Sequence, residues 1–325
     1  MEGENKNSKY MEKIKVAVLM GGPSVEHDVS LASGKAVCGA LDASRYDPMP
    51  VIIDRNGEWE IPFESVIGSA DIAFIALHGE YGENGVIQSL FEGVGFPYTG
   101  SSARSSALGM NKTASAQTFS AHGLLIPEWA AVSSHGDWAS FRPPFEFPVV
   151  VKPVDRGSSI GVNIVRNEGA LKDALCAVFD ISRHAMVQRY VSGRELSVGI
   201  VETEKGDIPL PPAEIIPKSS LFFDYDSKYS PDASKIVIPA NLNKMELEGV
   251  QKAALLVHKV IGASGVTRSD FIMSNDGRIF VLEINTIPGM AKDHLLPLSA
   301  AAGGMAMPML LDHIIAAAFR RFGVR

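Results

Sequence analysis

Asp276 and Gly277, near the C-terminus, predict a tight β-hairpin. They separate Arg268–Met273 from Arg278–Asn285, two stretches in which side chains of opposite character alternate. An Asp-Gly pair between such stretches is a strong signal for a two-residue hairpin turn. The two stretches are therefore expected to pair as antiparallel strands.

With the turn at that pair, the register places four polar side chains on one face of the hairpin. Asp270 lies opposite Glu283, and Arg268 lies opposite Asn285, because side chains alternate between the faces of a strand. Oxygen ligands of this kind suit Mg²⁺, and Mg²⁺ beside an arginine suits phosphate. The alternative is a solvated strand face with an ion pair. The opposite face is expected to be core and carries Ser269, Phe271, Met273, Phe280, Leu282 and Ile284.

The composition is that of an ordinary globular protein with more than one domain. The 325 residues suggest two or three domains, and 46% hydrophobic and 21% charged residues are typical values. A net charge of −7 argues against general binding to nucleic acid. Cys38 and Cys176 lie in apolar, helix-like surroundings and are expected to be buried thiols. Nothing requires an oxidising compartment, so a cytoplasmic location is expected.

No uninterrupted apolar stretch is long enough to span a bilayer, so no membrane association is expected. The region Ala300–Phe319 contains Pro308, Asp312 and His313. It is predicted to form a C-terminal amphipathic helix.

Residues 13–110 are predicted to form an α/β domain on a doubly wound parallel sheet. Lys13–Met20 is a strongly apolar run typical of a buried parallel strand. Further strands are expected at 50–54 and 72–77, with helices between and after them. Residues 1–12 are expected to be a disordered tail.

The rest of the chain is predicted to form two further units, 111–200 and 201–325. In the first, strands and a helix surround a Gly/Ser loop, which suggests a small α+β unit. In the second, residues 207–244 are rich in Pro, Asp, Ser and Tyr and are expected to be a long irregular segment. A helix at about 245–262 and then the hairpin follow.

The Gly/Ser loop, residues 155–161, has the composition of a phosphate-binding loop. Glycine lets backbone amides approach an anion, serine adds hydroxyl donors, and Lys152 supplies a positive charge. A plain turn is the alternative. Gly157–Gly161 also matches a hydrolase nucleophile elbow, but that pattern needs a helix after the turn, and Val162–Val165 resembles a strand. Neither the P-loop nor the dinucleotide-binding glycine pattern occurs in the sequence.

Polar residues follow two of the predicted parallel strands, at the end where such sheets bind ligands. Glu26 is a candidate to hold a substrate ammonium, or to cap the next helix together with Ser24 and Asp28. His78 lies on a glycine-rich loop and is either a ligand contact or a turn residue.

Two later segments are candidates for further parts of a site. Phe222–Tyr229 places aromatic and charged residues inside the irregular segment, which suggests a lid, with an ordinary surface loop as the alternative. Gly289 follows the hairpin, and its backbone N–H is a candidate oxyanion donor, with a simple strand-ending turn as the alternative.

In this order, these segments resemble the ATP-grasp superfamily, and more closely the D-alanine–D-alanine ligase family. The resemblance runs from about Ile14 to about Ala318. It rests on Gly21–Ser30, Leu77–Gly79, Tyr98–Ser101, Met110–Lys112, Lys152–Gly161, Tyr225–Tyr229, Arg268–Asp270 and Glu283–Gly289.

The resemblance implies a role for each matching residue. It implies catalytic roles for Glu26, Ser158, Tyr229, Arg268 and Gly289. It implies substrate contacts for His78, Lys228 and His294. It implies nucleotide contacts for Lys112, Lys152, Ser159, Gln188, Arg189, Val191, Glu195, Phe222 and Leu282. It implies that two Mg²⁺ (or Mn²⁺) ions are held by Asp270, Glu283 and Asn285.

The implied activity is the ATP-dependent joining of two D-alanines through a D-alanyl phosphate, for peptidoglycan precursor synthesis, by a homodimer. Three positions depart from the family pattern. Gln188 stands in the adenine-binding strand where the family usually has glutamate, and Asn84 replaces an aspartate. His294 stands where the family often has a small hydroxyl residue, so a different acceptor amino or hydroxy acid is the alternative. A nucleotide-binding protein without enzymatic activity is a third hypothesis, against which the full set of polar residues argues.

Overall fold

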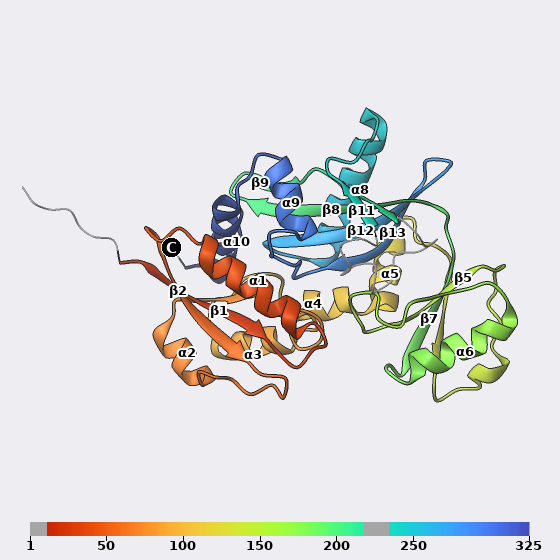
Figure 1. Cartoon of the computed structure of the whole chain (residues 1–325), viewed down its shortest axis with the longest axis horizontal. Coiled ribbons are helices and arrows are strands. Elements are labelled where there is room, and N and C mark those ends of the chain that lie inside the picture. The colour runs from red at the N-terminus through yellow and green to blue at the C-terminus, as the bar shows by residue number, and fades with distance from the viewer. Residues whose placement is uncertain (1–11, 218–233, 325) are drawn as a thin grey trace, which may run out of the picture.

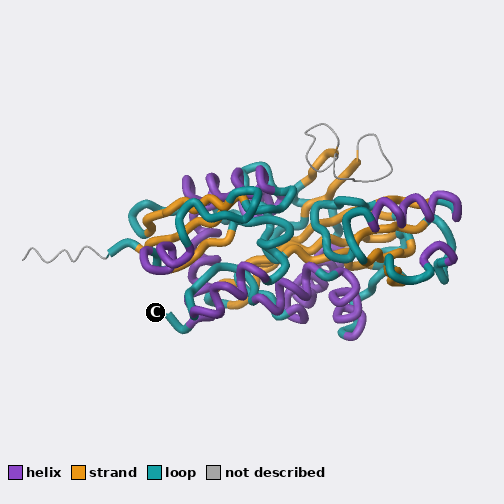
Figure 2. The backbone as a smooth tube through the Cα atoms, turned by 90° about the horizontal axis from the view of Figure 1, so that it is seen from below, coloured by secondary structure: helices purple, strands orange, loops and turns teal. Residues whose placement is uncertain are grey.

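The computed structural model describes residues 12–217 and 234–324. Among these residues, three sheets follow one another along the long axis of the molecule (Figures 1 and 2). Most of the predicted tail lies outside the described residues. The predicted lid, with Phe222, Lys228 and Tyr229, also lies outside them.

The N-terminal sheet is parallel, as predicted, with β1 in the middle and the strand order β2-β1-β3. Its strands are β1 (Ile14–Gly21), β2 (Tyr46–Ile53) and β3 (Ile72–Ile75). Helices of this part are α1 (His27–Ala40), α2 (Phe63–Ser69), α3 (Val86–Val94) and α4 (Ala103–Met110). The next helix, α5 (Lys112–Ala121), packs with Phe119 in the core of the C-terminal sheet.

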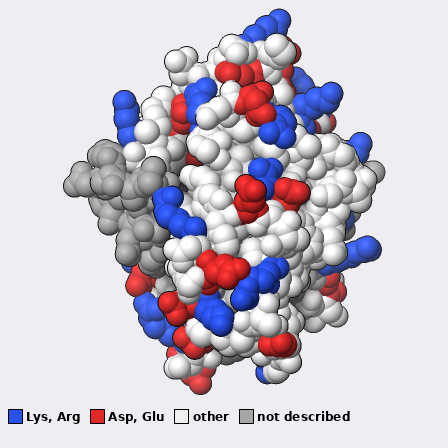
Figure 3. All heavy atoms as spheres, turned by 90° about the vertical axis from the view of Figure 1, so that its right-hand side faces the viewer, with Lys and Arg blue, Asp and Glu red and all other residues white. Residues whose placement is uncertain are grey.

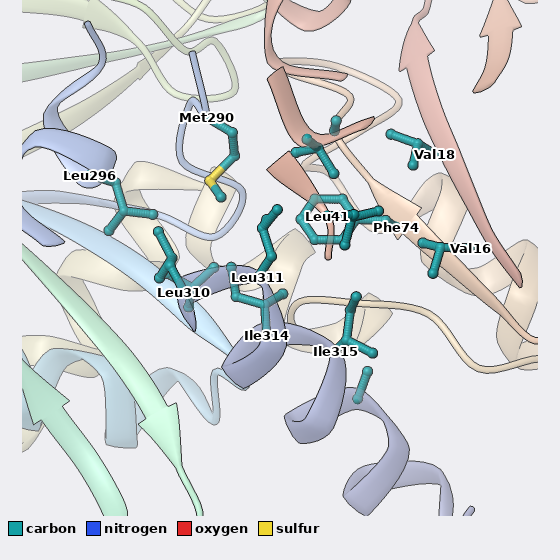
Figure 4. Close-up of a cluster of buried hydrophobic side chains, with 14 of the residues drawn as sticks. Val16, Val18, Leu41, Phe74, Met290, Leu296, Leu310, Leu311, Ile314 and Ile315 are labelled. Atoms are coloured by element: carbon teal, nitrogen blue, oxygen red, sulfur yellow. The ribbon is translucent and has the colours of Figure 1, made fainter. Parts of the chain in front are cut away.

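Both faces of this sheet are buried, which is why its strands are apolar throughout. Ala17 and Leu19 pack on the side of α2 and α3, whereas Val16 and Val18 pack in the cluster that includes α1. The second cluster also contains buried side chains of α10 (Met307–Phe322), from the other end of the chain (Figure 4). The C-terminal helix thus joins the N-terminal sheet to the rest of the protein.

The central unit is a small antiparallel sheet with the strand order β4-β7-β5-β6. Its elements are β4 (Trp129–Ser133), the 3-10 helix η1 (Trp138–Ser140), β5 (Val149–Pro153), β6 (Asn163–Val165), α6 (Glu168–Phe179) and β7 (His184–Arg189). The Gly/Ser loop joins β5 to β6. The end of the molecule that this unit forms carries intermingled acidic and basic side chains (Figure 3).

The C-terminal sheet follows the order β11-β10-β8-β12-β13, with β9 paired to β8. Its elements are β8 (Gly193–Thr203), β9 (Gly206–Pro209), β10 (Ala213–Pro217), β11 (Ser234–Val237), α8 (Lys244–Ile261), β12 (Val266–Ser274), β13 (Ile279–Asn285) and α9 (Leu295–Ala302). Because β10, β11 and all but the first residue of β9 lie within residues 207–244, the prediction that this whole segment is irregular was wrong.

Two further predictions need correction. The C-terminal region is not one helix, because α9 ends before Gly303 and α10 begins at Met307. In addition, Cys176 is exposed and Cys38 only partly buried. Within the described residues, no single helix is long and apolar enough to cross a membrane, although α9 and α10, bent by 108°, pass that test as a pair.

The hairpin forms, but with a different turn. Ser274 N donates to Arg278 O at 2.9 Å and Gly277 N donates to Ser274 O at 2.8 Å, so the loop has three residues instead of two. That shift alone would misalign Asp270 and Glu283, but an irregularity beside Asp270 restores the expected pairing. Leu282, expected in the core, instead lines a cavity on the same side as Glu283.

Candidate active site

Two cavities lined by described residues meet at the polar face of the hairpin. The first lies toward the N-terminal sheet, and the second lies between the central and C-terminal sheets. Lys112, Asp270 and Glu283 line both. These three charged side chains are therefore accessible from both cavities.

The hairpin face is built as the sequence predicted. Arg268 pairs with Asn285 and Asp270 with Glu283 in the strand register. The guanidinium of Arg268 donates to both oxygens of Asp270, at 3.2 and 3.1 Å, and Ser197 Oγ donates to Asp270 at 2.6 Å. Burial disfavours the charged form of Arg268, but attraction by Asp270 and Glu283 outweighs it, so the pKa of Arg268 lies above its ordinary value.

Lys112 brings a second cation to this face from the first turn of α5. Its Nζ lies 3.4 Å from Glu283 Oε2 and donates to the carbonyl of Arg156 at 2.5 Å. The helix starts at this position because the Asn111 side chain caps it, accepting from Ala114 N at 3.0 Å. The ammonium is therefore held beside a carboxylate and the Gly/Ser loop.

The Gly/Ser loop reaches the N-terminal sheet through its serine. Ser158 Oγ donates to Glu26 Oε1. Ser158 and Ser159 have φ values of 51° and 57°, a left-handed backbone conformation that residues other than glycine rarely adopt. A Cβ on Gly157 would lie 3.2 Å from Glu26 Oε2, so the loop backbone packs closely on this carboxylate. Glu26 is the residue before α1 and makes no side-chain cap, which excludes capping as its role.

His78 lines the first cavity and is buried in a hydrogen-bond network behind it. Its Nε2 lies 2.8 Å from Ser33 Oγ and its Nδ1 lies 3.0 Å from the carbonyl of Ile287. Ser33 Oγ also accepts from Met290 N at 3.0 Å. Glu83 Oε1 lies 3.6 Å from His78 Nδ1 and accepts from Gly79 N. Burial raises the pKa of the Glu83 carboxyl, and the charge of Glu26 adds to this, although His78 acts in the opposite direction.

His294 and Gly289 close the far side of the first cavity. A methyl group on Gly289 would overlap the imidazole of His294, so the backbone and the ring are in close contact. Burial lowers the pKa of His294, and His78 and Arg268 lower it further, although Asp293 acts in the opposite direction. The imidazole is therefore neutral near pH 7.

The second cavity contains the described residues expected to bind nucleotide. Lys152 and Gln188 are almost fully buried in its wall. Gln188 Nε2 donates to the carbonyl of Pro127 at 3.4 Å, and Arg189 pairs with Glu128 at 2.8 Å. The other expected residues in this wall are Lys112, Ser159, Val191, Glu195 and Leu282. The structure thus places the described residues expected to bind substrate around the first cavity and those expected to bind nucleotide around the second.

Comparisons with known proteins cover nearly the whole chain. The family model described as the D-ala D-ala ligase C-terminus matches residues 118–316, and the corresponding N-terminus model matches 15–65 and 60–101. A D-alanine–D-alanine ligase from Geotalea uraniireducens is 42% identical over 305 residues, which are 94% of this chain and 95% of the relative. The chain belongs to the D-alanine–D-alanine ligase family.

Solved structures of this family agree with that assignment. The D-alanine–D-alanine ligase from Bacillus anthracis, complexed with ATP, has a TM-score of 0.82 at 30% identity and covers 95% of this chain and 99% of its own. A D-Ala:D-Ser ligase from Enterococcus faecalis has a TM-score of 0.84 at 28% identity, covering 94% and 100%. The ATP-grasp fold predicted from the sequence is therefore confirmed.

Four residues of this site were not predicted from the sequence. Ser33 and Ser197 are single hydroxyls inside a helix and a strand, and no local pattern marks them. Glu83 lies in the same glycine-rich string as His78, a signal that was available, and Arg156 lies inside the Gly/Ser loop. What identifies Ser33, Ser197 and Arg156 is a contact between segments far apart in the chain, whereas Glu83 contacts His78 and Gly79 within its own loop.

Proposed function

We propose that this chain joins two D-alanines at the expense of ATP, through a D-alanyl phosphate, to give D-alanyl-D-alanine for peptidoglycan precursors. The meeting of the two cavities at Lys112, Asp270 and Glu283 carries the proposal. A nucleotide in the second cavity would direct its phosphates toward these residues. An amino acid in the first cavity would direct its carboxylate to the same place.

The residues of the first cavity suit an amino acid. The Glu26 carboxylate would bind the ammonium of the first D-alanine, and His78 would hold its position. Ser158, bonded to Glu26, would keep the Gly/Ser loop over the substrate. A carboxylate accepts an amine poorly until one oxygen becomes a good leaving group, and transfer of the γ-phosphoryl of ATP to that oxygen makes it one. Lys112 and Lys152 would offset the charge of the transferring group.

The second step needs an oxyanion donor and a dry site. The amine of the second D-alanine would attack the acyl carbon, and phosphate would leave. Arg268 and the backbone N–H of Gly289 would donate to the developing oxyanion. His294 would lie near the carboxylate of the second D-alanine. Tyr229 and Lys228 stay predictions, because they lie outside the described residues.

Asp270, Glu283 and Asn285 would hold two Mg²⁺ (or Mn²⁺) ions. The three offer oxygen donors from adjacent strands, which is the donor type that Mg²⁺ prefers. The two carboxylates attract positive charge, and Arg268 and Lys112 already lie against them at 3.1 and 3.4 Å, so a metal ion would compete with these two side chains for the same oxygens. The described residues contain no cluster of three or more His, Cys, Asp or Glu suited to a metal, so the amide of Asn285 is part of the proposal. When bound, the ions would neutralise the phosphates of ATP.

In the second cavity, Gln188 would bind the adenine amino group through its side-chain carbonyl, and Glu195 would contact the ribose. Ser159, Arg189, Val191 and Leu282 would complete the nucleotide wall, together with Phe222 from outside the described residues.

D-alanine-dependent release of ADP in the presence of Mg²⁺ tests the proposal. Mass spectrometry of the product from ATP and a mixture of D-amino acids would identify the acceptor. D-alanyl-D-alanine is expected as the main product. Absence of D-alanine-dependent ADP release would contradict the proposed function, and a mixed dipeptide as the main product would contradict the acceptor. The homodimer and the cytoplasmic location stay predictions, the first of which light scattering would test.

A further inference from the structure

The Gly/Ser loop has a second contact with the N-terminal domain, besides that of Ser158 with Glu26. Arg156 Nη1 forms an ion pair with Glu80 Oε1, and 30% and 39% of the two side chains are exposed. Glu80 lies in the loop after β3 that also carries His78. We infer that the Glu80–Arg156 pair positions the Gly/Ser loop over the substrate cavity. Arg156 is then a positioning residue for the reaction.

The loop needs support from outside. Ser158 and Ser159 both have left-handed backbone conformations, which cost free energy in residues with a side chain. Inside the loop, Ile160 N donates to Gly157 O at 3.1 Å and Val162 N donates to Ser159 O at 3.2 Å. Such a loop keeps one conformation only when contacts with neighbouring elements outweigh the strain.

Arg156 supplies contacts to three different elements. Its guanidinium pairs with Glu80 and also donates to the carbonyl of Ile181, in the turn after α6, at 2.6 Å. Its own carbonyl accepts from Lys112 Nζ at 2.5 Å. The residue therefore ties the loop to the N-terminal domain, to the central unit and to α5.

The Glu80–Arg156 contact lies beside the one between Ser158 and Glu26. Glu80 follows Gly79, whose position leaves no room for a Cβ because one would lie 2.8 Å from Glu26 Oε2. Glu26 thus contacts Ser158, and Glu80 contacts Arg156 of the same loop. Arg156 also lines the second cavity, so the loop touches both binding sites. Movement of the loop would change both sites together.

The effect on the loop follows from the contacts alone, whereas the effect on catalysis rests on the proposed function. The two are measured separately. Hydrogen exchange of peptides covering residues 155–161, without ligand, reports the loop. The kcat and KM for ATP in D-alanine-dependent ADP release report catalysis.

The variants are E80Q, R156Q, the double variant E80Q/R156Q and the charge swap E80R/R156E. The control is R142Q, which breaks an ion pair between Arg142 and Glu168, 2.9 Å apart and exposed, in the central unit. Asp155 lies 4.0 Å from Arg156 Nη1, so the swap would place two negative side chains together. The swap is therefore expected to recover the loop exchange and the KM of the unmodified protein only in part.

Each single variant is expected to raise loop exchange and the KM for ATP by about 1.5- to fivefold, the range for a partly exposed ion pair, with a smaller change in kcat. The double variant is expected to resemble R156Q, because R156Q already removes the contact with Glu80 and, in addition, the hydrogen bond to the Ile181 carbonyl. R142Q is expected to match the unmodified protein in both measurements.

Three results would overturn the inference. The first is exchange in both single variants equal to that of R142Q. The second is additive effects of the two substitutions. The third is a rise in KM with R156Q but not with E80Q, which would show that Arg156 binds phosphate directly and does not position the loop. If the unmodified protein releases no ADP with D-alanine, the proposed function fails, and the exchange measurement still decides on the ion pair.

Discussion

A Cβ on Gly289 would lie 2.7 Å from Cε1 of His294 and closer still to Nδ1. The imidazole of His294 therefore requires glycine at position 289, because a side chain there would occupy the space of the ring. The contact lies in the first cavity, where Gly289 is proposed to donate its backbone N–H.

Replacing Gly289 by alanine is expected to destabilise the protein by about 1–3 kcal/mol, the usual cost of overpacking, and to lower activity. The second substitution in G289A/H294A removes the ring and is expected to recover part of the thermal stability. G93A is a control, because a Cβ there meets nothing within 4 Å. If G289A and G289A/H294A melt at the same temperature, the overlap is not the cause of the loss.

Replacing Glu283 by glutamine is expected to lower kcat by about 10²–10³-fold, because the charge that would bind metal and that lies 3.4 Å from Lys112 is removed at constant shape. Steady-state ADP release at several Mg²⁺ concentrations measures this. D276N is the matched control, since Asp276 is an exposed carboxylate of the same hairpin that pairs with Arg278 at 2.8 Å. Activity of E283Q close to that of D276N would exclude Glu283 as a metal ligand.

Replacing Ser33 by alanine is expected to raise the KM for D-alanine, because His78 Nε2 and Met290 N lose a partner in a buried site. A loss of about 1–3 kcal/mol in the free energy of unfolding should accompany it. S30A is the control. Ser30 is also fully buried in α1 and also makes two hydrogen bonds, to Gly21 N and Ala76 O.

The two serine variants are expected to lose similar stability, but only S33A should change the KM. Equal KM values in the two variants would mean that the Ser33–His78 contact has a structural role alone. Thermal unfolding and D-alanine titration together separate the two effects.

Stability is expected to fall as the pH falls below about 6.5, in part because of His294. Burial lowers the pKa of this side chain in the folded protein, so the unfolded chain binds more protons in the window from about 6.5 down to the lower folded value. Proton uptake then favours unfolding. The pKa of His258 is also lowered by burial, so it contributes with the same sign.

The measurement is the melting temperature of H294N between about pH 8 and about pH 5.5, compared with the unmodified protein. A smaller drop is expected in H294N, with the His258 share remaining. H135N, which changes an exposed histidine, should leave the drop unchanged. An equal drop in all three proteins would contradict the assignment to His294.

The hairpin shows which structural features could be predicted from the local sequence and which could not. The alternation of side chains correctly placed Asp270 opposite Glu283 and Arg268 opposite Asn285. The route to that register was nevertheless different, with a three-residue loop and an irregularity beside Asp270. Near this irregularity, the hairpin also contacts a segment outside it, because Val281 N donates to the carbonyl of Leu125 at 2.9 Å. No pattern within the two strands contains that contact.

By itself, the sequence determined the parallel N-terminal sheet, the hairpin, the polar face and the family, because alternation, glycine positions and motif order are local properties. The tertiary structure alone decided which distant residues share a site. Ser33 meets His78 across 45 residues, and Ser197 meets Asp270 across 73. Glu80, in the loop after β3, meets Arg156 in the same way. Such contacts arise only when separate elements pack together, since neither partner alone differs from an ordinary helix, strand or loop residue.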